Sequence, residues 1–436
     1  MPPISRRTFL AGTAGAGILA AGATAGRSAV EHLVGHHPAA SAKAAVVAPP
    51  AAGHGPLVLI TLYGGNDGLN TVIPYADVAY EHGRPQLGYS ATDVLRLDAT
   101  VGLHPALTGL KALWDANQLA VVQGVGYPNP NRSHFRSMDI WQSAVPERDE
   151  PTGWLGRWLD TQAHDPMRAL SLGATLPRVL QGTREAAASI PSGQLSLPGG
   201  ASSAPVFQAL ERSYPGEADL AAFVARSGSD LLTVLRDVAT ILTTQPASVA
   251  PAANLEPAAT SAPTPGSSPR SGAPGTSGGA LGAQLDVVSR LIRGGAPTQV
   301  YSVSLGGFDT HAAEKATHDR LMAEVDAAIH GFLTGLAGHR AAGGVVVVAY
   351  SEFGRRVAEN ASGGTDHGTA APVFVAGPGV RGGLYGEYPS LTDLDQGDLR
   401  WSTDFRSVYA TLADKVLGAD PKTVLNGVAP APVPFL

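Results

Sequence analysis

The sequence predicts an α/β fold, with a doubly wound, mostly parallel sheet sandwiched between helices. Short segments rich in β-branched residues alternate along the chain with segments whose apolar residues recur at helical spacing, and this alternation is typical of parallel α/β sheets. Several of the short segments are apolar at every position. Central strands that are covered on both faces have this pattern.

Five segments have the pattern of strands, and four have the pattern of helices. Strands are expected at residues 57–63, 119–124, 299–305, 345–350 and 372–376. Helices are expected at residues 105–117, 134–144 and 316–338, and a closing helix is expected around Phe405, Val408, Tyr409 and Leu412. In each helix the apolar residues form a stripe that can face a core.

The N-terminus has the features of a twin-arginine signal peptide. Arg6 and Arg7 precede an apolar pair, and residues 10–26 are uncharged but too short and too weakly apolar for a comfortable membrane span. We expect a signal peptide and disordered leader at residues 1–44, with cleavage between Ala23 and Ala44; a retained anchor is the alternative. The twin-arginine translocase would then export the folded protein to the periplasm, the cell wall or the medium, with no stable membrane span left after cleavage.

The remaining chain, residues 55–436, is expected to form one domain. Residues 245–283 are mostly Pro, Ala, Ser, Thr and Gly, so we predict a disordered insert there, in a surface loop of that domain.

Composition limits the possible chemistry. The chain of 436 residues has 30 Lys and Arg against 36 Asp and Glu, a net charge of −6, and no basic stripe, which argues against nucleic acid as a partner. It has no cysteine. Thiolate ligands and thiol nucleophiles are therefore excluded, and His, carboxylate, hydroxyl and Arg remain.

Polar residues lie beside each expected strand, in five loops that mostly contain glycine. In an open parallel sheet the carboxyl ends of the strands form the ligand crevice, so these loops should meet at one edge. In chain order the loops supply Asp67; Arg132 and Ser133; Asp309 and His311; Glu352 and Arg355; and Asp366 and His367.

Carboxylate and imidazole together suit a divalent metal ion. The expected ligands are Asp67, Asp309, His311, Asp366 and His367. Zinc, manganese or iron fits this mixed set, and its oxygens also admit magnesium or calcium. The alternative is a purely hydrogen-bonded loop network, since Asp and His are common in caps and turns.

Ser133 stands where the N-cap of the expected helix at 134–144 should be. It is either only a cap or a nucleophile next to the metal, at the positive end of a helix dipole. Arg132 and Arg355 could bind a tetrahedral oxyanion.

Taken together, these motifs are specific. The segments are GGNDGLN (64–70), RSHF (132–135), GWLGR (153–157), GGFDTH (306–311), SEFGR (351–355) and GTDHG (364–368). The set resembles the domain of unknown function 1501 family from about residue 57 to the C-terminus. The resemblance implies an alkaline-phosphatase-like or sulfatase-like fold around a two-metal hydrolytic site.

The resemblance also implies individual roles. Asp67 matches a metal-bridging aspartate and Ser133 the nucleophile. Asp309 with His311, and Asp366 with His367, resemble the ligand pairs of the two metals. Glu352 lies where a further carboxylate ligand or a general base could be supplied.

Three departures from the superfamily pattern are visible. Asp309 and His311 are only two residues apart, which leaves His318 as an alternative partner. No histidine follows His367, so one metal is lost or is completed by His104, His134 or water. The serine or cysteine motif of formylglycine sulfatases is absent.

We therefore expect an exported, metal-dependent hydrolase that acts on a small anionic substrate, a phosphate or sulfate ester. The alternative is a non-catalytic metal- or ligand-binding accessory protein that keeps the hydrolase fold. Fold-level likeness does not decide between these two functions.

Overall fold

The computed structural model describes residues 55–191, 219–245, 279–428 and 430–436, without the side chains of residues 219–223. The predicted signal and leader at residues 1–44 lie outside the described residues, as do residues 246–278 of the predicted insert. The C-terminal end of the predicted insert differs from the prediction because it is helical. Residues 280–283 form the first turn of helix α10 (Ala280–Arg293), where Leu281 is buried among other apolar side chains.

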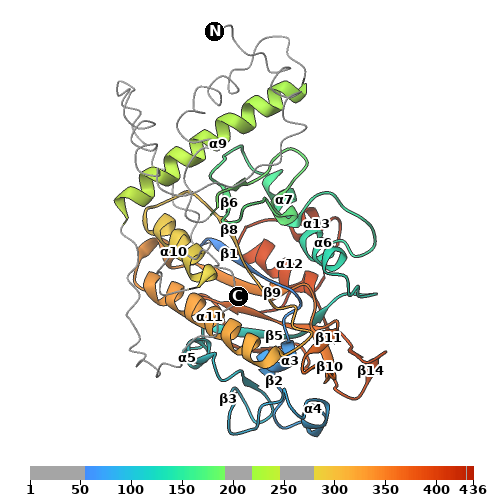
Figure 1. The fold of residues 1–436 in the computed structure, drawn as a ribbon. Helices are drawn as coiled ribbons and strands as arrows, with labels where there is room; N and C mark the ends of the chain where they lie inside the picture. Colours follow the sequence, from blue (N-terminus) through green and yellow to red (C-terminus); the bar gives the residue numbers. More distant parts are fainter. Residues whose placement is uncertain (1–54, 192–218, 246–278, 429) are drawn as a thin grey trace, which may run out of the picture.

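A central sheet organises the molecule (Figure 1). Its strand order is β13-β5-β12-β9-β1-β8-β6-β7, and β16 also pairs with β5. All of its pairings are parallel except the two made by β12, so the predicted α/β class with a mostly parallel sheet is confirmed. The strands are β1 (Leu57–Tyr63), β5 (Leu119–Gly126), β6 (Ala169–Ser171), β7 (Ala188–Ser189), β8 (Val300–Gly306), β9 (Val346–Ser351), β12 (Ala371–Ala376), β13 (Gly383–Tyr385) and β16 (Thr403–Asp404).

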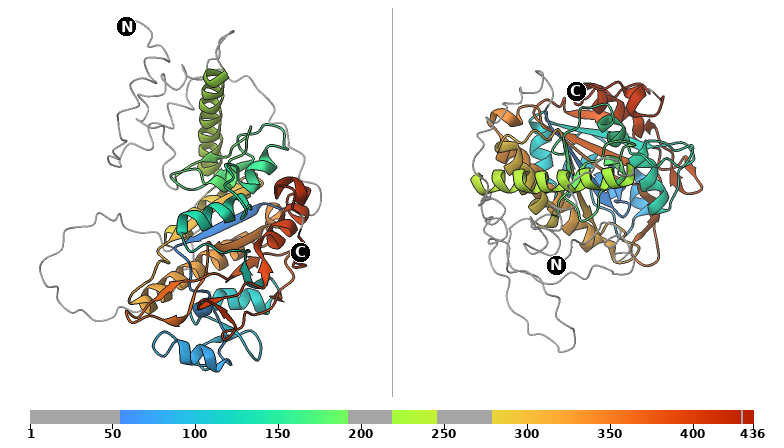
Figure 2. Two further views of the ribbon diagram at one scale, coloured as in Figure 1. Left: turned by 90° about the vertical axis from the view of Figure 1, so that its right-hand side faces the viewer. Right: turned by 90° about the horizontal axis from the view of Figure 1, so that it is seen from above.

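Helices cover both faces of the sheet, as two views show (Figures 1 and 2). Val58 and Ile60 of β1 face one core, with α5, α10 and α11, whereas Leu57 and Leu59 face the other, with α6, α7 and α12. This alternation lets a wholly apolar strand fill two cores at once. The helices are α5 (Thr108–Asp115), α6 (His134–Ser143), α7 (Trp154–Leu159), α11 (Glu314–Leu336), α12 (Phe405–Lys415) and α13 (Pro421–Val424).

Smaller elements lie around this sandwich. Helix α9 (Asp219–Thr244) crosses the end of the molecule that holds β6 and β7 (Figures 1 and 2). The others are α3 (Gly68–Thr71), α4 (Val78–Gly83), η1 (Arg178–Leu180), η3 (Arg340–Ala342), the sheet of β2 (Val72–Ile73), β4 (Gly102–Leu103) and β3 (Leu95–Arg96), and the hairpins of β10 (Arg355–Glu359) with β11 (Thr365–His367) and of β14 (Leu394–Asp395) with β15 (Asp398–Leu399).

The predicted elements agree with the observed ones to within a few residues. Helix α5 begins at Thr108, three residues later than expected, because Leu107 closes a turn onto the carbonyl of His104 (2.9 Å). Helix α11 ends at Leu336, and Gly338 beyond it has a φ of 77°. Among the described helices, none is long and apolar enough to cross a membrane.

Candidate metal centre

The loops that follow three adjacent strands meet at one edge of the central sheet. In the parallel trio β9-β1-β8, Leu62 pairs with Ser351 and Tyr63 with Gly306, so the three strands end at the same level. Gly64 has a φ of 119°, and a Cβ placed on it would lie 2.5 Å from the backbone nitrogen of Asp309. Glycine at this position therefore permits the close contact between the loops after β1 and β8.

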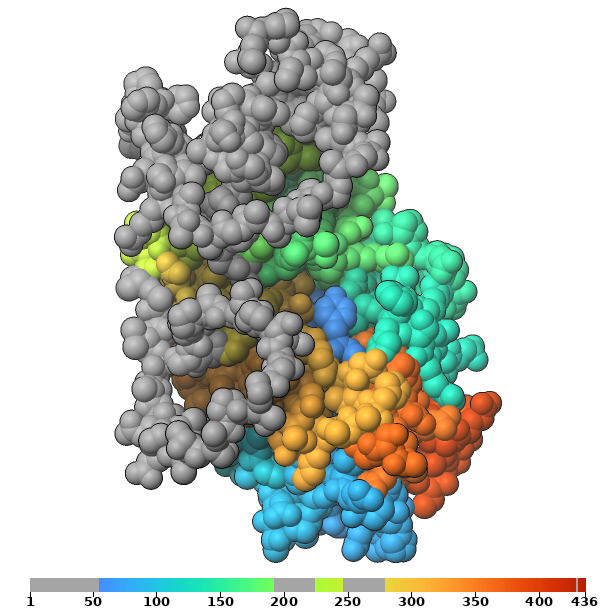
Figure 3. All heavy atoms as spheres, viewed as in Figure 1, coloured from blue at the N-terminus to red at the C-terminus, as the bar shows by residue number. Residues whose placement is uncertain are grey.

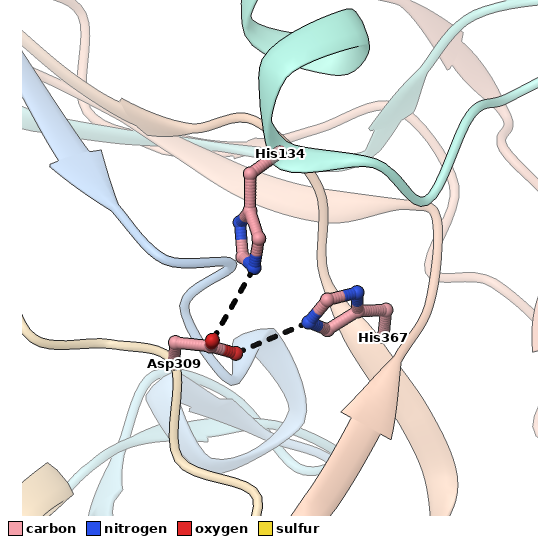
Figure 4. Close-up of side chains that lie close together, drawn as sticks. All are labelled: His134, Asp309 and His367. Carbon is pink, nitrogen blue, oxygen red and sulfur yellow. Dashed lines mark hydrogen bonds and ion pairs between the residues drawn. The ribbon is translucent and has the colours of Figure 1, made fainter.

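Three side chains from different loops converge at this edge (Figure 4). Nε2 of His134, at the start of α6, lies 3.4 Å from Oδ2 of Asp309. Nε2 of His367, at the end of β11, lies 3.1 Å from Oδ1 of the same carboxylate. Among the residues that the structure describes, His134, Asp309 and His367 are the one group of three such side chains arranged to hold a metal ion.

The hydrogen bonds of the two imidazoles decide which nitrogens face the group. Nδ1 of His367 lies 2.9 Å from the carbonyl oxygen of Arg132, which can only accept, so Nδ1 carries the proton. Nδ1 of His134 likewise faces the Glu352 carboxylate at 2.8 Å. In the neutral imidazoles both Nε2 atoms therefore direct a lone pair toward Asp309, and Nε2 of His134 is buried without a hydrogen-bond partner.

Glu352 holds His134 rather than pointing into the group itself. Its side chain is 1 % exposed, and its Oε1 also accepts the backbone N–H of Gly64 at 2.9 Å. Oε2 accepts from the hydroxyl of Ser351 at 3.0 Å. A carboxylate behind a ligand histidine fixes its tautomer and orientation.

Arg355 holds Asp309 from within the protein. One terminal nitrogen donates to Oδ1 of Asp309 at 2.8 Å, and the other donates to the carbonyl of Thr365 at 2.8 Å. Its side chain is fully buried, and it also donates to the carbonyls of Gly64, Gly65 and Phe308. The expectation that Arg355 would bind a substrate oxyanion is therefore corrected, because loop carbonyls and Asp309 enclose the guanidinium.

His311 and Asp366 lie beside the group and not within it. Nε2 of His311 is 3.0 Å from Oδ1 of Asp309 and 2.9 Å from Nε2 of His367. Its Nδ1 is 3.6 Å from Oδ1 of Asp366, which also accepts from Asn360 at 3.3 Å. Asp366 is thus placed to orient His311.

Ser133 and Arg132 lie next to His134 along the chain. Ser133 is exposed and occupies the N-cap position of α6, as predicted, but its hydroxyl makes no capping hydrogen bond. The guanidinium of Arg132 is half-exposed and pairs with the buried Asp398 at 2.5 Å. Both residues are accessible to solvent beside the imidazoles.

Asp67 is placed differently from the expectation that it bridges metal ions. Its carboxylate is buried and accepts from both terminal nitrogens of Arg84, at 2.9 Å for one of them. The guanidinium occupies the position where a cation would have to bind, which corrects the assignment of Asp67 as a ligand. His318 and His104, the alternatives for completing a site, lie near Asp67 and Asp319 respectively.

The electrostatics of the group favour an ionised Asp309 carboxylate and a neutral His367 imidazole. Burial opposes ionisation of Asp309, but its contacts with Arg355 and His367 outweigh burial and lower its pKa to about 2. Burial lowers the pKa of His367 below its ordinary value, against the raising effect of Asp309. A cation between the two Nε2 atoms and the carboxylate would be attracted by the negative charge of Asp309, which Arg355 also contacts.

The donor set fits a transition-metal ion. Zinc bonds of about 2.0–2.2 Å place tetrahedral ligand atoms about 3.3 Å apart. Here Nε2 of His134 lies 3.4 Å from one Asp309 oxygen and Nε2 of His367 lies 3.1 Å from the other, and one ligand atom from each of the three residues lies within 4.8 Å of the other two. Imidazole donors suit zinc or ferrous iron better than magnesium or calcium. The side chains of the group are 22–48 % exposed, so an ion would keep an open position toward solvent.

The sequence predicts other roles for three of the residues that shape this edge. His134 was only an alternative ligand, and the roles of Glu352 and Arg355 in holding other side chains were not foreseen. The signal for His134 was its position in the RSHF segment, directly after Ser133 at a helix start. No local pattern distinguishes a buried Arg355 from an exposed one.

Fold and site together define a class: an α/β protein with a surface centre of imidazole and carboxylate at the carboxyl edge of its sheet. The chain belongs to the family described as protein of unknown function (DUF1501), whose model matches residues 56–432. The predicted family is confirmed. No curated protein matches the sequence.

Solved structures resemble this chain only distantly. Ps i-CgsB matches with a TM-score of 0.37 and 10 % identity, over 86 % of this chain and 75 % of its own. The zinc complex of the C-terminal periplasmic domain of EcEptC from Escherichia coli has a TM-score of 0.31 and 11 % identity, over 74 % of each chain. BT1596, a 2-O GAG sulfatase, has a TM-score of 0.30 and 11 % identity, over 76 % of this chain and 65 % of its own. Likenesses this distant identify neither a substrate nor a mechanism.

Proposed function

We propose that the protein is a metal-dependent hydrolase of phosphate or sulfate esters, with zinc as the preferred ion, held by His134, Asp309 and His367. The observation that carries this proposal is the orientation of the two imidazoles. Each has Nδ1 held by an acceptor, and each directs Nε2 at the same carboxylate; Nε2 of His134 has no hydrogen-bond partner, and Nε2 of His367 also lies 2.9 Å from Nε2 of His311. A bound divalent ion would supply Lewis-acid polarisation of an ester oxygen and a lower pKa for a coordinated hydroxyl or water.

The surrounding residues give the site the other requirements of ester hydrolysis. Ser133 has an exposed hydroxyl that is not used as a cap, so it is free to attack phosphorus or sulfur and release the alcohol. Water would then cleave the serine ester and regenerate the hydroxyl. Arg132 brings a half-exposed positive charge next to Ser133 for an anionic group.

We also propose that the protein acts outside the cytoplasm, as Arg6 and Arg7 predict. Fractionation tests this localisation separately. Cells that express the full chain are compared with cells that express the variant in which both arginines are changed to Lys. Retention of both forms in the cytoplasm would contradict it.

Metal content and turnover test the proposed function directly. Purified protein should contain about one equivalent of transition metal by elemental analysis, and it should hydrolyse some member of a panel of chromogenic phosphate monoesters, diesters and sulfates. His367→Ala should lose both metal and turnover. His82→Ala, an exposed imidazole in α4, is the matched control and should keep both.

Ser133→Ala separates two versions of the reaction. Loss of turnover with metal retained supports the serine as nucleophile, whereas unchanged turnover assigns the attack to water. Stoichiometric metal with no turnover on any ester would instead establish the non-catalytic binding function.

A further inference from the structure

A second group of polar side chains lies buried in the molecule, away from the solvent-exposed metal centre. Asp67, Arg84, Glu314 and His318 are each at most 2 % exposed. Asp67 and Arg84 form the ion pair described above, and His318 lies 3.2 Å from the side-chain oxygen of Asn66. We call Asp67, Arg84 and Glu314 the buried triad.

The buried triad lies against two of the three segments that carry the metal centre, the β10–β11 hairpin and the loop after β8. Arg84 donates to the carbonyl oxygens of Arg356 (2.8 Å) and Val357 (3.0 Å) in β10. Glu314 accepts from the hydroxyl of Thr365 in β11 at 2.7 Å. Strand β10 pairs with β11 in the register Arg355↔His367, so the triad supports the hairpin that presents His367.

Two backbone hydrogen bonds next to these contacts connect the hairpin with the segment that presents Asp309. The backbone N–H of Glu314 donates to the carbonyl of Gly363 at 2.9 Å, and that of Thr365 donates to the carbonyl of Thr310 at 3.2 Å. The residues in these two hydrogen bonds therefore lie one to five positions along the chain from Asp309 or His367.

The charges of the triad balance only if Glu314 carries a proton. Burial raises the pKa of Glu314 to about 8, and the negative charge of Asp67 adds to this effect. Burial opposes ionisation of Asp67, but Arg84 outweighs it and lowers that pKa to about 2. Burial lowers the pKa of His318 to about 4, so its imidazole is neutral.

The groups around the triad bring no further charge that could neutralise an ionised Glu314. Arg84 and Asp67 neutralise each other, and Thr365 contributes a hydroxyl. Lys315, the next residue of α11, lies over the ring of Tyr89 at 3.2 Å, and Asp319 pairs with His104.

We propose that Asp67, Arg84 and Glu314 are positioning residues of the metal centre, which hold the β10–β11 hairpin and the 309–313 loop in the arrangement that binds the ion. This inference rests on the proposed metal site. It assigns a function to Asp67 that is not coordination: its charge fixes Arg84, and Arg84 fixes β10.

A pH dependence follows from the proton on Glu314. A carboxyl whose pKa is higher in the folded state than its ordinary value of 4.5 contributes stability below that value, and this contribution is lost as the pH rises through about 8. Above pH 8 two buried carboxylates would face one guanidinium, and the hairpin should loosen. Metal affinity should then fall as the pH rises through about 8.

Glu314→Gln is the informative variant, because glutamine keeps the shape and the acceptor for Thr365 but cannot ionise. Zinc affinity is measured by competition with a chromophoric chelator at pH 7 and at pH 9. Between these two pH values the affinity of the wild type should fall about tenfold more than the affinity of Glu314→Gln. Glu314→Ala should bind zinc about 10–100-fold more weakly than the wild type at pH 7. Glu324→Gln, on the same helix but against α10, is the control.

Hydrogen exchange gives a readout that does not need the metal. In metal-free protein the amides of residues 309–311 and 363–368 should exchange faster in Glu314→Ala than in Glu314→Gln at pH 7. Equal exchange and equal zinc affinity in the wild type and both variants would overturn the inference. Absence of zinc binding by the wild type would overturn the proposed function. Hydrogen exchange alone would then show whether the buried triad holds the hairpin and the 309–313 loop in place.

Discussion

His134 and His367 illustrate how single side chains acquire a chemical role. Free imidazole exchanges its proton between two nitrogens, whereas each ring here has one nitrogen fixed, by Glu352 or by the carbonyl of Arg132. The opposite nitrogens are therefore available as ligands without a cost of reorientation. The chemistry of the centre depends on these second contacts as much as on the ligands themselves.

Glu352→Gln tests this dependence at the residue scale. The amide keeps the volume of the side chain but weakens the acceptor for His134 Nδ1, so zinc affinity should fall about 10–100-fold with little change in fold. Isothermal titration with zinc measures the affinity, and circular dichroism checks the fold. Asp414→Asn, an exposed carboxylate on α12, should bind zinc as the wild type does; an unchanged affinity in Glu352→Gln would contradict the dependence of the centre on the Glu352 carboxylate.

At the scale of elements, three parallel strands in register place their following loops at one edge. The loop after β1 contacts the loop after β8 through Gly64, because the chain there has a φ of 119° and no room for a side chain. Strand β12 runs antiparallel, so the segment before it, and not after it, reaches the same edge with His367. One reversed strand thus brings a fifth loop to the site.

Gly64→Ala should disturb this contact. An added Cβ would lie 2.5 Å from the Asp309 backbone nitrogen, and the strained conformation costs about 1–3 kcal/mol by itself. We expect a lower free energy of unfolding in urea and weaker zinc binding. Gly306→Ala, at the end of β8 with open space around its Cβ, should change neither quantity by more than about 0.5–1 kcal/mol. Equal behaviour of the two variants would contradict the proposed contact.

At the scale of the whole molecule, the centre joins segments that are far apart in sequence. In the space-filling view, teal, orange and red surface from distant parts of the chain adjoins on the face shown (Figure 3). An ion that bridges α6, the loop after β8 and β11 would therefore cross-link the folded chain. Because the unfolded chain does not bring these residues together, binding of the ion should stabilise the fold.

Metal removal tests this link. At a free zinc concentration 100 times the dissociation constant, the folded state should gain about 2.7 kcal/mol, and a chelator should reverse the gain. Differential scanning calorimetry measures the shift in melting temperature. His367→Ala should melt at the same temperature with and without zinc; a zinc-dependent shift in that variant would place the ion elsewhere.

The sequence alone determined the sandwich architecture and the five loops that meet at its edge. Strands that are apolar at every position indicate burial on both faces of the sheet. Such patterns are local, so residues 57–63 or 345–350 can be interpreted without knowing which strands lie beside them. The candidate residues Asp309 and His367 were also visible, because glycine-framed Asp and His at strand ends are a local signal.

Only the tertiary structure decided which polar residues face the ion and which hold the others. Asp67 and Asp309 have similar glycine-rich surroundings in the sequence, yet both terminal nitrogens of Arg84 hold the first carboxylate, whereas one terminal nitrogen of Arg355 holds the second and leaves it open to imidazoles. A local sequence pattern does not show which residue, 17 or more positions away, will pair with a given side chain. Whether a carboxylate stays open to an ion depends on how completely packing surrounds it with other partners, and those partners are known only once the chain has folded.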